Sequence, residues 1–115
     1  MTTYEIACLD LLHSDAQVGE LDVLESCLDL AAAGRLSWVM VSTHSHHISG
    51  GPLTHQRCLA VLLRAGATIV AEHDVQESFS GDGLIVGKFG ALPAGSTIIA
   101  IRRTCSAIRS MIWPR

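Results

Sequence analysis

The stretch of sequence that decides the fold is LSWVMVST, residues Leu36–Thr43. It is apolar and rich in β-branched residues, and its apolar positions do not alternate strictly with polar ones. Strands that are buried on both faces of a parallel sheet have this pattern, because helices cover them on either side. The stretch therefore predicts a central strand of an α/β fold, with a helix before it and a helix after it.

Both helices can be read from the sequence. Residues 20–33 place apolar side chains at spacings of three and four, which is the period of an amphipathic helix. Gly34 follows this segment as a left-handed stop. The second helix is predicted over residues 53–65, with Pro52 in a first-turn position and Gly66 as its terminator. These residues are all read from the printed chain.

Three further segments read as strands: residues 6–16, 67–72 and 96–102, the last one after a Gly-rich connection over residues 80–95. Strands that alternate with helices indicate a layered α/β fold with crossover connections. About four strands and two crossover helices make only part of an open sheet. We therefore expect residues 1–115 to form one partial domain, the C-terminal half of a Rossmann-like sheet.

Composition limits the function. The chain has 115 residues, 49% of them hydrophobic, and a net charge of −3, which argues against a nucleic-acid surface. Its apolar runs are shorter than the roughly 20 residues of a membrane span, and its N-terminus does not read as a signal peptide. Four widely spaced cysteines predict reduced thiols, so we expect a cytoplasmic protein. The apolar excess suggests a homo-oligomer.

Polar residues follow the predicted strands where a ligand crevice of an open α/β sheet would lie. Asp15 lies at the polar end of the first strand, where it either faces this crevice or caps the following helix. Thr43 to His47 follow the second strand. If that strand continued, His44 and His46 would share a face and could hold a metal, although a general-base role for His44 is the stronger hypothesis.

The third polar group follows the strand over residues 67–72 and contains Glu72, His73, Asp74 and Glu77. A charged run that leaves a buried strand is usually a solvated loop. No GxGxxG or GxxxxGK[ST] phosphate-binding loop occurs anywhere in the chain. We therefore predict no cofactor-binding residue and no metal ligand from motifs.

Three segments together resemble the FkbM-type methyltransferases, which use S-adenosylmethionine. They are LDLLHSDAQVGELDVLES (residues 9–26), WVMVSTHSHHISG (residues 38–50) and EHDVQESFSGDGLIV (residues 72–86). In that family the fourth strand ends in a pattern like hDhxGAExxVL, and the next strand ends in a Thr-His or Glu-His pair. The third segment is similar to the family's substrate-side loop and final strand region. One departure is that the glycine before Glu20 is displaced by one position.

The resemblance implies an O-methyltransferase with a small-molecule methyl acceptor. It implies Asp15 and His44 as catalytic residues, and Glu20, Ser45, His46 and Glu72 on the substrate side. In the family a Gly-rich loop and an acidic residue hold S-adenosylmethionine, and neither has a counterpart here. We therefore expect this chain to bind no cofactor and to be inactive alone. The alternative is a non-catalytic half-domain that dimerises through its open sheet edge.

Overall fold

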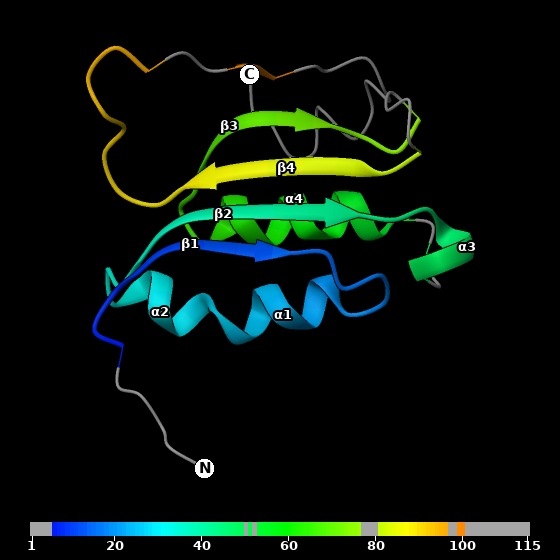
Figure 1. Cartoon of the computed structure of the whole chain (residues 1–115), viewed down its shortest axis with the longest axis horizontal. Coiled ribbons are helices and arrows are strands. Elements are labelled where there is room, and N and C mark those ends of the chain that lie inside the picture. Colours follow the sequence, from blue (N-terminus) through cyan, green and yellow to red (C-terminus); the bar gives the residue numbers. More distant parts are fainter. Residues whose placement is uncertain (1–5, 50, 52, 77–80, 97–98, 101–115) are drawn as a thin grey trace.

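The predicted central strand is strand β2, Leu36–Thr43, with the bounds expected from the sequence. The computed structural model describes residues 6–49, 51, 53–76, 81–96 and 99–100. Its other strands are β1 (Leu9–Ser14), β3 (Thr68–His73), β4 (Gly83–Lys88) and the two-residue β5 (Ile99–Ala100). They form one sheet in the order β1-β2-β4-β3-β5 (Figure 1). The α/β class is therefore confirmed.

The sheet is mixed, whereas the sequence predicted a parallel one. Strands β1 and β2 are parallel, as are β3 and β5, but β4 runs antiparallel to both β2 and β3. Strand β4 lies within residues 80–95, which were predicted as a Gly-rich connection, so that prediction was wrong. Of the strand predicted over residues 96–102, the described part of the chain contains β5; residues 97–98 and 101–102 lie outside it.

The first predicted helix is divided into α1 (Glu20–Ser26) and α2 (Leu28–Ala32), with Cys27 between them. Ser26 Oγ donates a hydrogen bond to the Val23 carbonyl at 2.7 Å, and such local bonds compete with the helical ladder and bend it. A short helix, α3 (His46–Ser49), follows β2, and the second predicted helix is α4 (Thr54–Arg64). Gly34 and Gly66 both have positive φ, of 70° and 93°, so the predicted helix stops are confirmed.

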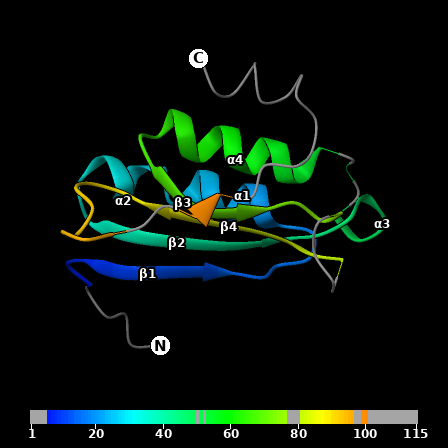
Figure 2. The same cartoon turned by 90° about the horizontal axis from the view of Figure 1, so that it is seen from above.

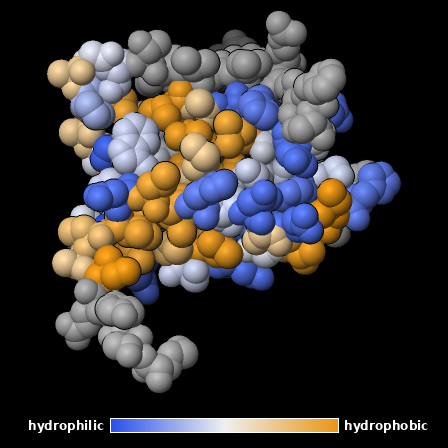
Figure 3. Space-filling view, in the orientation of Figure 1, coloured by the Kyte–Doolittle hydropathy of each residue, from blue (hydrophilic) through white to orange (hydrophobic). Residues whose placement is uncertain are grey.

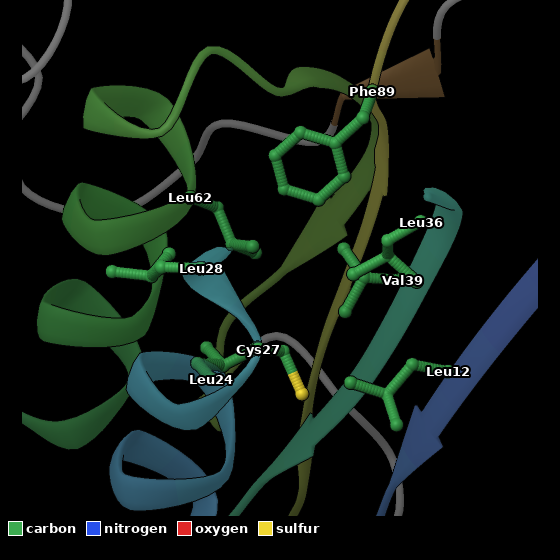
Figure 4. A pocket seen from close by; sticks show the side chains of 8 residues that line it. All are labelled: Leu12, Leu24, Cys27, Leu28, Leu36, Val39, Leu62 and Phe89. Atoms are coloured by element: carbon green, nitrogen blue, oxygen red, sulfur yellow. The ribbon is translucent and has the colours of Figure 1, made fainter. Parts of the chain in front are cut away.

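Helices α1, α2 and α4 all lie on one face of the sheet (Figure 2), so the prediction that helices cover β2 on both faces was wrong. Leu24 of α1 and Leu62 of α4 meet Val39, Val41 and Ile85 of the sheet in the core, each 2% exposed or less. A cavity of about 10 Å³ remains between these layers. Its lining is apolar and it holds about one water at most, so it is dry and no ligand site (Figure 4). The residues that line it are Leu12, Leu24, Cys27, Leu28, Leu36, Val39, Leu62 and Phe89.

The opposite face of the sheet carries no helix in the part of the chain that the structure describes. Apolar side chains gather there (Figure 3). Trp38, Met40 and Val86 are half-buried, and the Lys88 ammonium lies 5.6 Å from the centre of the Trp38 ring. Leu11 of the edge strand β1 is 50% exposed. Within the described ranges, no helix has the length and apolarity that crossing a bilayer requires.

Candidate functional site

Strands β1, β2 and β3 point in the same direction, so the residues that follow them meet at one edge of the sheet (Figure 1). The antiparallel strand β4 begins at that edge, because its first residue, Gly83, pairs with Thr43, the last residue of β2. The sheet thus brings together segments that are far apart in the chain. This edge holds most of the residues that were predicted as functional.

His44 is the centre of the site. Its Nδ1 lies 2.6 Å from Glu20 Oε1, and its Nε2 lies 3.0 Å from Asp15 Oδ1. Asp82 Oδ1 is 3.9 Å from the same Nε2. The imidazole is 5% exposed and the Glu20 side chain is fully buried, whereas Asp15 is 57% exposed. The structure therefore brings Asp15, Glu20 and His44 together, with Glu20 on the inner side of the ring and Asp15 on the outer side.

The contacts constrain how the protons are arranged. An ionised carboxylate only accepts hydrogen bonds, so Nδ1 donates to Glu20, and while Asp15 lies against Nε2 that nitrogen donates as well. Nε2 can act as a base only once Asp15 has moved away and taken that proton with it. The second oxygen of this carboxylate, Oε2, is buried and has no hydrogen-bond partner among the described residues. His44 is therefore the main compensation for a buried negative charge. The pairing orients the ring, and it leaves Nε2 as the nitrogen that faces the surface.

A strained turn carries the chain from Asp15 to Glu20. The Val18 N–H donates to the Ala16 carbonyl at 2.7 Å, and the residue between them, Gln17, has a φ of +63°. A non-glycine residue rarely adopts this φ, and it is found more often at functional sites. Helix α1 has Gly19 as its N-cap with no side-chain cap bond. Asp15 therefore does not cap this helix, which removes the alternative interpretation of that residue.

The other predicted residues have different positions. Ser45 is half-buried and comes directly before α3, and its carbonyl accepts a hydrogen bond from the Ile48 N–H at 2.9 Å. His46 begins α3, so β2 does not continue through it as the shared-face hypothesis required. The side chain of His46 lies outside the described atoms, as does Glu77. Asp74 Oδ1 accepts from the Gln76 N–H at 2.9 Å, a local turn bond.

Glu72 belongs to a second cluster that the sequence analysis missed. Its Oε1 lies 2.8 Å from His55 Nε2, and His55 Nδ1 lies 2.6 Å from Thr43 Oγ1. Thr43 is fully buried and His55 is 5% exposed. One signal could have found His55: it shares the buried stripe of α4 with Cys58, Leu59 and Leu62 at spacings of three, four and seven. A buried histidine needs hydrogen-bond partners.

The buried charge of Glu20 also affects the pKa of Cys58, a residue of helix α4. Burial, together with a smaller effect of the negative charge of Glu20, raises the pKa of its thiol from the ordinary 9.0 to about 12. The thiol is 0% exposed. Only the thiolate is a good nucleophile, so Cys58 is chemically inert.

We expect the stability of the chain to fall between pH 9 and 12 because of Cys58. Below pH 9 the thiol is protonated in both the folded and the unfolded chain, so it adds no pH dependence. Above pH 9 the unfolded chain loses this proton while the folded chain keeps it, which favours unfolding until about pH 12. Denaturant unfolding at several pH values measures this loss. Cys58→Ala should flatten the curve over this range, and an unchanged slope would contradict the assignment.

No group of three or more His, Cys, Asp or Glu residues in the described ranges could hold a metal ion. Comparison of the chain with protein-family models, with curated proteins and with solved structures gave no match in any of the three. The geometry at this edge of the sheet is therefore the basis for the functional argument that follows.

Proposed function

We propose that this chain is the acceptor side of an S-adenosylmethionine-dependent O-methyltransferase of the FkbM type, with His44 as the general base. The sheet is compatible with the C-terminal half of a Rossmann-like domain. The observation that carries the proposal is the contact of His44 with Glu20 and Asp15. The family resemblance had named these three residues from separate segments, and they lie in one cluster at the carboxyl ends of β1 and β2.

The place of strand β4 adds support. The resemblance assigned residues 72–86 to the family's substrate-side loop and final strand region. Strand β4 starts within this run, and Asp82, directly before it, lies 3.9 Å from His44 Nε2. The loop that precedes β4 thus reaches the same nitrogen as Asp15 does. We place the acceptor hydroxyl beside Nε2, between these two carboxylates.

The chemistry proposed for the site is removal of the acceptor's proton. Glu20 accepts the hydrogen bond from Nδ1–H and so holds the ring with Nε2 toward the acceptor side. Asp15 is more than half exposed and can rotate away, so an acceptor hydroxyl can take its place against Nε2. The hydroxyl proton would move to Nε2, which would leave the acceptor oxygen with more negative charge and make it a better nucleophile. General-base assistance of this kind typically contributes about 10²–10⁴-fold to a rate.

The sequence of this chain offers no motif for S-adenosylmethionine. It has no Gly-rich phosphate-type loop, and the apolar cavity between the sheet and its helices, about 10 Å³, is far smaller than the cofactor. We therefore draw no step of the mechanism through a cofactor bound by these residues. The proposal assigns only the acceptor side to this chain, and it places the reaction in the cytoplasm with a small-molecule acceptor.

A second candidate function is the non-catalytic module that forms a dimer. The outer edge of β1 favours it, because no other strand of the described residues pairs there and an edge strand presents unpaired backbone groups to another chain. Leu11, on this strand, is 50% exposed, and the sheet face beside it carries half-buried apolar side chains. A second copy that pairs with β1 would extend the sheet and cover this edge.

Two solution measurements separate the candidates. Calorimetric titration of the chain with S-adenosylmethionine should show no micromolar binding, and such binding would contradict the assignment of the cofactor side to residues outside this chain. Sedimentation then gives the oligomeric state. A stable dimer that Leu11→Lys disrupts would favour the module. The catalytic proposal itself is tested in a polypeptide that joins this chain to a cofactor-binding half, by transfer of a labelled methyl group to hydroxyl compounds with His44 present and with His44→Ala.

A further inference from the structure

A second histidine is built into the same edge of the sheet as His44, at its inner side. His55 of helix α4 joins Thr43 of β2 to Glu72 of β3 through its two ring nitrogens, at 2.6 and 2.8 Å. A carboxylate only accepts hydrogen bonds, so Nε2 carries a proton and donates a hydrogen bond to Glu72. In the neutral ring Nδ1 then accepts the hydrogen bond that the Thr43 hydroxyl donates. The hydroxyl, imidazole and carboxylate thus form one continuous relay.

This relay resembles a nucleophilic triad, but its hydroxyl cannot act on a substrate. Thr43 is 0% exposed, and Gly83 lies directly over the hydrogen bond between Thr43 and His55. A Cβ at residue 83 would overlap Thr43 Oγ1 and would lie 2.6 Å from His55 Nδ1. The absence of a side chain at Gly83 lets β4 close over the relay. The geometry therefore allows the Thr43–His55 hydrogen bond to hold neighbouring residues in place, but not to attack a substrate.

Two pairs of neighbouring residues connect the relay to His44. Thr43 is the residue before His44, so the bond that fixes Thr43 also fixes the end of β2. Asp82 is the residue before Gly83, and its Oδ1 lies 3.9 Å from His44 Nε2. The same two chain segments, 43–44 and 82–83, therefore take part in both clusters.

We infer that His55 is a positioning residue, which acts through Thr43 to set the direction of the His44 ring between Glu20 and Asp15. The inference rests on the proposed function in one respect only: the reaction in which His44 would act is taken from it. The placement of the ring is a separate property, and it can be measured without any methyl acceptor. Glu72, which the sequence placed on the substrate side, has the role of holding His55.

Two substitutions of similar size separate the halves of the relay. The amide of His55→Asn ends near the position of Nδ1, so it can still accept from Thr43 while the bond to Glu72 is lost. The amide of His55→Gln reaches the position of Nε2, so it keeps Glu72 and loses Thr43. We expect the His44 ring to keep its wild-type ¹⁵N and ¹H signals in His55→Asn, and to lose them in His55→Gln.

Thr43 gives a matched second pair. Thr43→Ser keeps the hydroxyl and should leave the His44 signals in place, whereas Thr43→Val keeps the shape, lacks the hydroxyl and should shift them. Thermal unfolding of each variant shows whether it is folded. Equal shifts of the His44 signals in both members of each pair would mean a merely structural role, and unshifted signals in His55→Gln and Thr43→Val would overturn the inference. If the wild-type protein showed no methyl transfer, the proposed function would fail, but the NMR test of the His44 ring position would still stand.

Discussion

Replacement of His44 by alanine is expected to lower the rate of methyl transfer by about 10²–10⁴-fold. The expectation follows from the place of the imidazole, which faces the surface with Nε2 while Glu20 holds Nδ1 at 2.6 Å. No other described side chain is so placed between a buried and an exposed carboxylate. The rate is measured with labelled S-adenosylmethionine in a polypeptide that joins this chain to a cofactor-binding half. Substrate concentrations are kept saturating, so that the chemical step is compared.

His13→Ala is the matched control for this prediction. His13 lies on the neighbouring strand β1, one register position from the same edge, but it is exposed and pairs with Met40. Its removal should leave the rate within about twofold, because among the described residues no hydrogen bond or ion pair joins it to Asp15 or Glu20, the carboxylate partners of His44. If His44→Ala retained the wild-type rate, the assignment of the base would be wrong. An equal loss in both variants would point to general damage at the edge.

Gly83→Ala is expected to destabilise the fold by about 2–5 kcal/mol, the sum of an overpacking cost and a broken buried hydrogen bond. The new methyl group would overlap Thr43 Oγ1 and would lie 2.6 Å from His55 Nδ1. Thr43 is short, β-branched and fully buried, so it cannot move aside without losing the bond to His55. Denaturant unfolding followed by circular dichroism measures the loss. It is a large share of the 5–15 kcal/mol that stabilises a typical domain.

Gly87→Ala, on the same strand, provides the comparison. A Cβ there would lie 3.2 Å from Val39 Cγ1 and 3.4 Å from Ala67 Cβ, so a shift of a few tenths of an ångström is enough. We expect about 1 kcal/mol at this position. The double variant Gly83→Ala/Thr43→Ala should lose less stability than the sum of its two single variants, because the clash with Oγ1 is gone. Additive losses would contradict the contact.

Strand β4 shows why part of the fold escaped prediction. Strand β2 and both helix stops are set by local rules, namely apolar β-branched residues and glycines with positive φ, and these were predicted correctly. The segment GLIVGK has a glycine at each end of its apolar centre, which lowers strand propensity and reads as a connection. The glycines are needed because Thr43, His55, Val39 and Ala67 approach β4 closely. That requirement is tertiary, and the local pattern does not contain it.

The candidate site divides in the same way. Asp15, Glu20 and His44 could be named from motifs at strand ends, but the full burial of Glu20 could not, since a glutamate at the start of an amphipathic helix is usually solvated. His55 was missed because no residue inside the predicted helix over residues 53–65 was considered as a candidate, although His55 lies on the buried stripe of that helix. Its partners, Thr43 and Glu72, come from two different strands. Only the strand order brings them together.

The central claim is that Glu20 holds the Nδ1 proton of His44 and leaves Nε2 as the base. Long-range ¹H–¹⁵N spectra of the wild-type chain, recorded through the titration of the ring, locate this proton directly. We predict that the neutral ring carries its proton on Nδ1, and that Glu20→Gln weakens this preference while the chain stays folded. A neutral His44 ring with the proton on Nε2 and a bare Nδ1 would contradict the account.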